Sequence, residues 1–415
     1  MHRGLVDIIN TPGYVTILTG EPGIGKTSIA LLSCARRGKC TYITYAEPES
    51  SLLNKLKMVA RGFSPSVNIV SALSGDPAPV FSLISEMLEK GDLVIVDSLD
   101  AMFYGIKDEG SIRSFIQLIY GTSKRKQGSL LLVSEGLSHA AEHVKFVCDS
   151  VISLSWDKIM DARVRMAMIM KDRDYPVDNP VQYFTVGNGL AFTERKFYYS
   201  KPKLSRLRSF IRAQEVTVRA VEDLGYNVLI EVEPDVSYIL HKILRRLVAA
   251  DYLLQGYRVN YWLGPQEDEK EAAEDLRTLS GPNFRNLRIM YVDPKDFDYS
   301  AERFMEHLLN TYASENAIDI IDLLAQEDFA VESPVEYEMF VKRAVRANTS
   351  LRRISVVYGY SNGKATEIRS KYMNLIRRVA VKDGFTFVKA VKPWGPLYYL
   401  DLDLARGQIN TMEMK

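Results

Sequence analysis

Residues 20–27 read GEPGIGKT, an octapeptide whose residue types and spacing could hold phosphate groups. Its glycines lack a Cβ, so the backbone can fold into a nest of amide donors, toward which a following helix points its N-terminus. Lys26 would reach the β- and γ-phosphates, and the Thr27 hydroxyl would bind Mg²⁺. An apolar, β-rich run precedes this loop and a helical pattern that Gly38 stops follows it. This is the context of a Walker A motif, so we predict that ATP and Mg²⁺ bind at Gly20, Glu21, Pro22, Gly23, Ile24, Gly25, Lys26, Thr27 and Ser28.

A second candidate metal ligand ends the apolar run at residues 93–97, which finishes in Asp97. A buried parallel strand of this kind places its last carboxylate at the carboxyl edge of the sheet, beside the metal. We therefore predict a Walker B strand, with Asp97 and Thr27 as the Mg²⁺ ligands.

Hydrolysis also needs a group that orients or deprotonates water. The run at residues 40–45 reads as a strand, and Pro48 ends it because proline denies the next ladder donor. Glu47 then lies at the strand tip on the phosphate side, and we predict it as the catalytic residue that orients or deprotonates the water. Glu49 is the alternative, and a solvated loop acid is the other interpretation of Glu47.

Five segments together resemble the KaiC-like branch of the RecA superfamily, mostly archaeal and bacterial ATPases related to the RadA recombinases. They are residues 11–27, 45–48, 94–99, 130–135 and 146–154, in the family's order. The resemblance covers about the first 195 residues. It implies a RecA-like α/β fold, a slow ATPase, and a nucleotide state that controls assembly or binding of a protein partner.

Residues 168–173 resemble the family's Lys-x-Arg strand, whose two cations reach the γ-phosphate of a neighbouring subunit. By this resemblance, Lys171 and Arg173 would be cationic fingers that reach the γ-phosphate bound by a neighbouring copy of the chain. Asp172 and Asp174 depart from the family pattern, in which a small apolar residue and a glycine are usual. The alternative is that the second half of the chain supplies the finger, through Lys389 or Lys392.

The second half contains a faint repeat of the first. Residues 229–238 align with the Walker A region, but Val232, Asp235 and Ser237 replace the glycines, Tyr238 the lysine and Ile239 the threonine. Further runs align with later strands of the first half: 256–265, 318–323, which keeps Asp322, 353–359 and 385–389. We predict two tandem RecA-like domains, the second without a functional phosphate-binding loop. The alternative is an unrelated α/β domain whose strands coincide by chance.

The predicted organisation is an ATPase domain over residues 1–195, a basic linker over 196–214 and a degenerate domain over 215–415. Residues 195–212 carry seven Lys and Arg without an acid, interleaved with aromatic residues. This composition is typical of a linker and also of a nucleic-acid-binding surface. It keeps two alternative functions open, a recombinase-paralogue accessory factor in DNA repair and a transcriptional regulator resembling GvpD.

Overall properties predict an intracellular protein with two cores. A chain of 415 residues with 47% apolar content exceeds what one core usually holds. The net charge of +1 gives no global attraction to nucleic acid. Cys34, Cys40 and Cys148 show no metal spacing and no disulfide framework, so we expect the reducing cytoplasm. No apolar run approaches the ~20 residues that cross a bilayer, which predicts that no membrane is involved.

Overall fold

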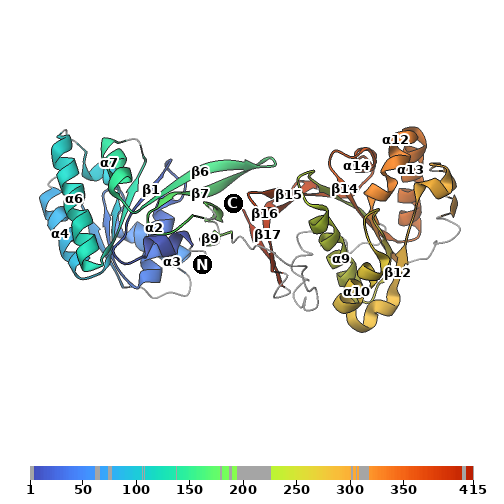
Figure 1. The fold of residues 1–415 in the computed structure, drawn as a ribbon, viewed down its shortest axis with the longest axis horizontal. Coiled ribbons are helices and arrows are strands. Elements are labelled where there is room, and N and C mark those ends of the chain that lie inside the picture. Colours follow the sequence, from blue (N-terminus) through green and yellow to red (C-terminus); the bar gives the residue numbers. More distant parts are fainter. Residues whose placement is uncertain are drawn as a thin grey trace. The chain divides into compact units, whose positions relative to one another are not determined.

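The computed structural model describes most of the chain, in two compact units that comprise residues 1–193 and 194–414. The residues described are 4–60, 66–72, 77–104, 106, 108–136, 138–177, 180–186, 189–193, 226–300, 302–304, 306–307, 317–403 and 408–414. The predicted linker at 196–214 and the basic segment at 195–212 lie outside these residues. Among the described residues, each unit contains a nine-stranded, mostly parallel sheet flanked by helices (Figure 1).

The sheet of the first unit has the strand order β3-β2-β4-β5-β1-β6-β7-β8-β9. Its first six strands in this order run parallel, and β7, β8 and β9 are added antiparallel. The strands are β1 (Val15–Gly20), β2 (Lys39–Thr44), β3 (Ser66–Ser71), β4 (Leu93–Asp97), β5 (Ser129–Ser134), β6 (Ser150–Ile159), β7 (Ala162–Asp172), β8 (Val181–Thr185) and β9 (Ala191–Phe192). The central strands β1, β4 and β5 are buried on both faces, as their continuous apolar runs require.

Helices cover both faces of this sheet (Figure 1). One core packs α1 (Leu5–Ile9), α2 (Lys26–Arg37) and α3 (Glu49–Val59) against the sheet. The other core packs α4 (Pro77–Glu89), α5 (Leu99–Met102), α6 (Glu109–Lys126) and α7 (His139–Val147) against the opposite face. Parallel strands joined by helices end at a common edge, so the segments that follow β1, β2, β4 and β5 gather there.

The second unit repeats this plan with the strand order β12-β11-β13-β14-β10-β15-β16-β17-β18. Numbered within each unit, the two orders are identical, and the last three strands are again antiparallel. The strands are β10 (Asn227–Val232), β11 (Arg258–Trp262), β12 (Leu287–Met290), β13 (Ala317–Asp322), β14 (Ile354–Tyr360), β15 (Leu375–Lys382), β16 (Phe385–Lys392), β17 (Leu397–Asp403) and β18 (Gln408–Glu413).

The second sheet is also covered on both faces. α9 (Tyr238–Leu254) and α10 (Glu269–Ser280) pack on one side. α12 (Glu327–Glu332), α13 (Pro334–Ser350) and α14 (Lys364–Ser370) pack on the other, and short 3₁₀ helices lie at Gly281–Asn286, Pro294–Phe297 and Leu323–Gln326. The chain is thus an α/β protein with two mixed, mostly parallel sheets, consistent with two tandem α/β domains. Each run that the sequence aligned with the first half contributes to the corresponding strand of the second sheet.

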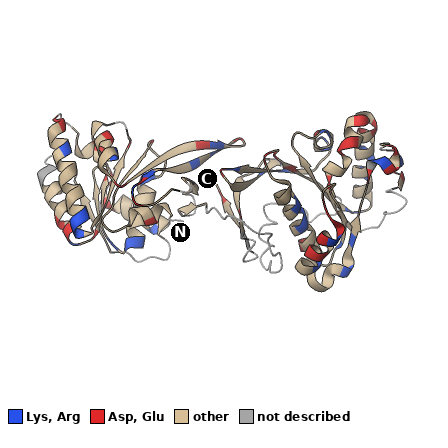
Figure 2. Ribbon diagram, in the orientation of Figure 1, with Lys and Arg blue, Asp and Glu red and all other residues tan. Residues whose placement is uncertain are grey.

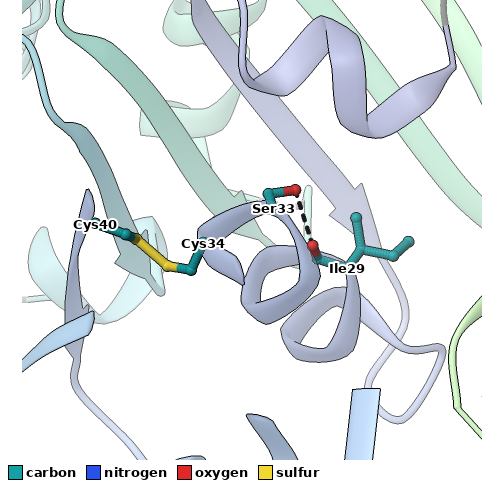
Figure 3. The surroundings of a disulfide bond; sticks show 4 residues. All are labelled: Ile29, Ser33, Cys34 and Cys40. Carbon is teal, nitrogen blue, oxygen red and sulfur yellow. Dashed lines mark hydrogen bonds between the residues drawn. A yellow bond between two sulfur atoms is a disulfide. The ribbon is translucent and has the colours of Figure 1, made fainter. Parts of the chain in front are cut away.

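The expectation that the cysteines form no disulfide is wrong. Cys34 near the end of α2 and Cys40 in β2 form a disulfide, with their Cα atoms 5.2 Å apart (Figure 3). Gly38, with a φ of 86°, ends α2 and turns the chain directly into β2, which brings these close neighbours together. Cys148 is a buried free thiol.

None of the helices among the described residues is both long and apolar enough to span a membrane.

Candidate nucleotide-binding site

The predicted phosphate-binding loop connects β1 to α2 at the carboxyl edge of the first sheet. β1 ends at Gly20, and α2 begins at Lys26 with Gly25 as its N-cap. Gly25 has a φ of 115°, and a Cβ on Gly20 would lie 2.7 Å from the carbonyl oxygen of Leu154, so side chains at these positions would be strained or would clash. No side chain caps the N-terminus of α2. Its first amides are therefore available to an anionic ligand.

The Lys26 side chain folds back over the loop. Its Nζ donates to the carbonyl oxygen of Gly20 at 2.6 Å and to that of Glu21 at 3.0 Å. Partial burial lowers the pKa of Lys26, although the negative charges of Glu135, Asp97 and Asp100 oppose this shift. The ammonium thus lies at the loop among carboxylates, where phosphate oxygens can replace the carbonyl acceptors.

The side chains of Thr27 and Asp97 lie within hydrogen-bond distance of each other, and two ligands of one metal ion must be close together in this way. The Thr27 hydroxyl donates to Oδ2 of Asp97 at 3.0 Å, and the Tyr42 hydroxyl donates to the same oxygen at 2.5 Å. Burial and the Asp97 charge hold the pKa of Tyr42 well above its usual range, so it stays a donor. A hydroxyl and a carboxylate are hard oxygen ligands of the kind that Mg²⁺ prefers, so the donor set fits this ion.

Glu47 follows β2 at the same edge, but its carboxylate is engaged locally. It accepts a hydrogen bond from Ser51 at 2.9 Å and forms an ion pair with Lys55, both on α3. Burial opposes ionisation, yet the hydrogen bonds from Lys55 and Ser51 and the Lys55 charge together lower the pKa of Glu47. Glu47 is therefore a charged acid whose two oxygens each already accept a hydrogen bond from α3. The alternative acid, Glu49, begins α3.

Glu135 lies at the loop as well, and the sequence reasoning did not select it. β5 pairs with β1 so that Ser134 is opposite Thr19, which brings the next residue, Glu135, beside Gly20. Asp100 anchors this strand end, because its Oδ2 accepts from the Glu135 amide at 2.7 Å and its Oδ1 from the Ser134 hydroxyl at 3.1 Å. The rule that selected Glu47, an acid at the end of a neighbouring strand on the phosphate side, applies equally to Glu135.

Lys171 and Arg173 lie away from Lys26 of the same unit. Lys171 pairs with Val151 near the start of β6, whereas Gly20 pairs with Leu154 toward the opposite edge. The Lys171 Nζ donates to carbonyl oxygens at the end of α7, including that of Cys148 at 2.7 Å. Two strands and about 10 Å along them separate these residues from the loop, at ~3.3 Å per residue and ~4.8 Å per strand.

Arg173 and the neighbouring acids are also bound within the unit. Arg173 donates to the Tyr120 hydroxyl at 2.6 Å and to the Val147 carbonyl oxygen at 3.1 Å. Asp174, one of the two acids that depart from the family pattern, accepts from the Tyr14 hydroxyl at 2.8 Å. A finger role for Lys171 and Arg173 therefore requires the phosphates of another copy.

The corresponding place in the second unit holds a buried cation. α9 begins at Tyr238, the counterpart of Lys26, and the Ser237 side chain caps the Leu240 amide at 3.3 Å. Asp322, the counterpart of Asp97, pairs with the fully buried guanidinium of Arg245. Tyr238 donates to the same Asp322 oxygen at 3.3 Å. An arginine thus neutralises the carboxylate that aligns with Asp97, the predicted metal ligand of the first unit.

A second acid completes this buried network. Arg245 also pairs with Glu267, whose side chain is fully buried, and Arg246 lies 3.2 Å from the same residue. Burial alone would lower the pKa of Arg245, but the Tyr261 hydroxyl, Asp322 and Glu267 outweigh this effect and raise it. Figure 2 shows acidic and basic residues close together around α9 and α10. Among the described residues, the positions of the second unit that align with this site thus have a helix N-terminus capped by Ser237 and a carboxylate paired with arginine.

No protein-family model matches the sequence, and no curated protein is significantly similar to it.

Proposed function

We propose that the first unit binds Mg-ATP and hydrolyses it slowly, as a KaiC-like ATPase of the RecA superfamily, and that the nucleotide state controls assembly or binding of a protein partner. The second unit is then a degenerate RecA-like domain without a nucleotide. The proposal rests on one observation. Lys26 and Thr27 of the predicted Walker A motif lie at the same edge of the sheet as Asp97 of the predicted Walker B strand, and Thr27 is hydrogen-bonded to Asp97.

Different residues of the site would bind the phosphates, hold the metal ion and orient the Asp97 carboxylate. The amides of the loop and the N-terminus of α2 bind the phosphates, and Lys26 stabilises the charge that develops on the β- and γ-phosphates. Thr27 and Asp97 would hold Mg²⁺, which neutralises phosphate charge when it is bound. Tyr42 orients the Asp97 carboxylate through the hydrogen bond of its buried hydroxyl.

Replacing Lys26 tests this proposal. We expect Lys26→Ala to weaken binding of Mg-ATP by about 10²-fold or more and to abolish turnover, because it removes charge-assisted hydrogen bonds to the phosphates. Calorimetric titration and phosphate release measure the two effects.

Lys57→Ala is the matched control, since Lys57 is an exposed lysine on α3 of the same unit. It should bind and hydrolyse ATP like the unaltered protein. If Lys26→Ala retains both properties, or the unaltered protein binds no nucleotide, the proposed function is wrong.

A further inference from the structure

We propose that Glu135 is the catalytic residue that orients and deprotonates the water attacking the γ-phosphate. This inference rests on the proposed ATPase function and deepens it. The sequence predicts Glu47 for this role, so substituting each of the two acids in turn can decide which one is the general base.

The first support is the position of Glu135 in the sheet. β5 lies between β4, which carries Asp97, and β1, which leads into the loop. Ser134 is paired with Thr19, so Glu135 comes beside Gly20, whose carbonyl oxygen accepts from Lys26. Side chains alternate along a strand, and Leu131 and Val133 pack in the core that contains α2. Continued by one residue past the end of β5, this alternation places Glu135 on the same face of the sheet, which α2 covers.

The second support is that the end of β5 is held in place. Asp100 accepts hydrogen bonds from the Glu135 amide and the Ser134 hydroxyl, and the Gly136 amide donates to the Ser134 Oγ at 2.8 Å. A Cβ on Gly136 would lie 3.3 Å from that of Thr19, so the chain passes close to β1 as it leaves β5. A general base is effective when its neighbours fix its position in this way.

The third support is that the Glu135 carboxylate is free to act. The residue is exposed, and its carboxylate accepts no hydrogen bond from any residue in the described part of the chain. By contrast, both oxygens of the Glu47 carboxylate already accept hydrogen bonds, one from Ser51 and one from Lys55. An exposed acid beside the phosphate-binding loop can bind a water molecule without giving up another hydrogen bond, which favours a general-base role.

The proposed hydrolysis accounts for each bond and proton with ATP, one water molecule and the Glu135 carboxylate. The Glu135 carboxylate accepts a proton from water as the water oxygen forms a bond to the γ-phosphorus. The bond between that phosphorus and the oxygen bridging it to the β-phosphate breaks, and its electron pair leaves with ADP. The products are ADP and inorganic phosphate, and Glu135 returns its proton to solvent.

The test compares three single substitutions, Glu135→Gln, Glu47→Gln and Glu142→Gln. We expect Glu135→Gln to lower kcat by about 10²-fold or more, because glutamine keeps the shape but cannot accept the proton. Affinity for Mg-ATP, measured by calorimetry, should stay equal or become tighter, since a negative charge near the phosphates is lost. Glu142→Gln, which removes an exposed acid on α7, should leave both quantities unchanged.

Glu47→Gln should lower kcat less than Glu135→Gln does. The inference is overturned if Glu135→Gln turns over ATP at the rate of the unaltered protein, or if Glu47→Gln alone causes the large loss. A fall in affinity with kcat unchanged would show that Glu135 only supports the loop, which also contradicts the proposal. Failure of the proposed function differs from all of these, because the unaltered protein itself would then bind or hydrolyse no ATP.

Discussion

A mixture of two inactive variants is expected to regain ATP turnover. One variant is Lys26→Ala, which is inactive in its own site, and the other is Lys171→Ala/Arg173→Ala, which lacks the proposed fingers. At some interfaces of a mixed assembly an intact finger meets an intact site. A cationic finger can contribute ~10³-fold or more to phosphoryl transfer, so even a fraction of repaired interfaces should rise above background. Phosphate release over a series of mixing ratios measures the recovery.

Each parent variant must be shown to be folded, because Lys171 and Arg173 also bind the carbonyl oxygens at the end of α7. Circular dichroism and thermal unfolding of each parent provide this control. If both parents are folded and no ratio restores turnover, the fingers do not act between copies. Lys389→Ala then tests the alternative finger, although Lys389 is almost fully buried and its ammonium lies over the Trp394 ring at 5.1 Å.

Arg245→Ala is expected to destabilise the second unit by about 3 to 5 kcal/mol. The Arg245 guanidinium pairs with Asp322 and Glu267, and all three side chains are fully buried. Removing the cation leaves two carboxylates in the interior without their main partner, and an uncompensated buried charge has a cost of this size. Urea unfolding of the full chain, followed by tryptophan fluorescence, measures the loss; Trp262 in β11 and Trp394 report on the second unit, and Trp156 in β6 reports on the first.

Arg303→Ala is the matched control, because Arg303 pairs with Asp298 where the two side chains are 66% and 79% exposed. Exposed ion pairs contribute little, so this variant should unfold with the unaltered protein. ATP binding by the first unit should survive in Arg245→Ala, since the loop lies in the other unit. Equal stability of Arg245→Ala and the unaltered protein would show that the buried network does not hold the second unit together.

Local patterns predicted much of the first unit. The loop between β1 and α2, the strand that ends in Asp97 and the strand before Glu47 each have a signature within about ten residues, and each of these elements lies where it was predicted. Glycines, an apolar run and a proline act on the backbone directly, so their effects are visible in a sequence. The pairing of Thr27 with Asp97 follows once parallel strands share an edge.

What the sequence did not reveal depends on neighbours that are distant along the chain. Glu135 reaches the loop only because β5 lies between β1 and β4, an order that no local pattern specifies. Arg245 belongs to an ordinary helical pattern, and its role appears only when Asp322 and Glu267 converge on it. The Cys34–Cys40 disulfide was missed because two cysteines six residues apart have no framework spacing.

The central claim, that one unit holds a nucleotide and the other has lost its site, is tested most directly by the stoichiometry of binding. Calorimetric titration of the full chain with Mg²⁺ and a slowly hydrolysed ATP analogue gives this number. The account predicts one nucleotide per chain and none for Lys26→Ala, because Arg245 neutralises Asp322 in the second unit. Two nucleotides per chain, or one that persists in Lys26→Ala, would contradict it.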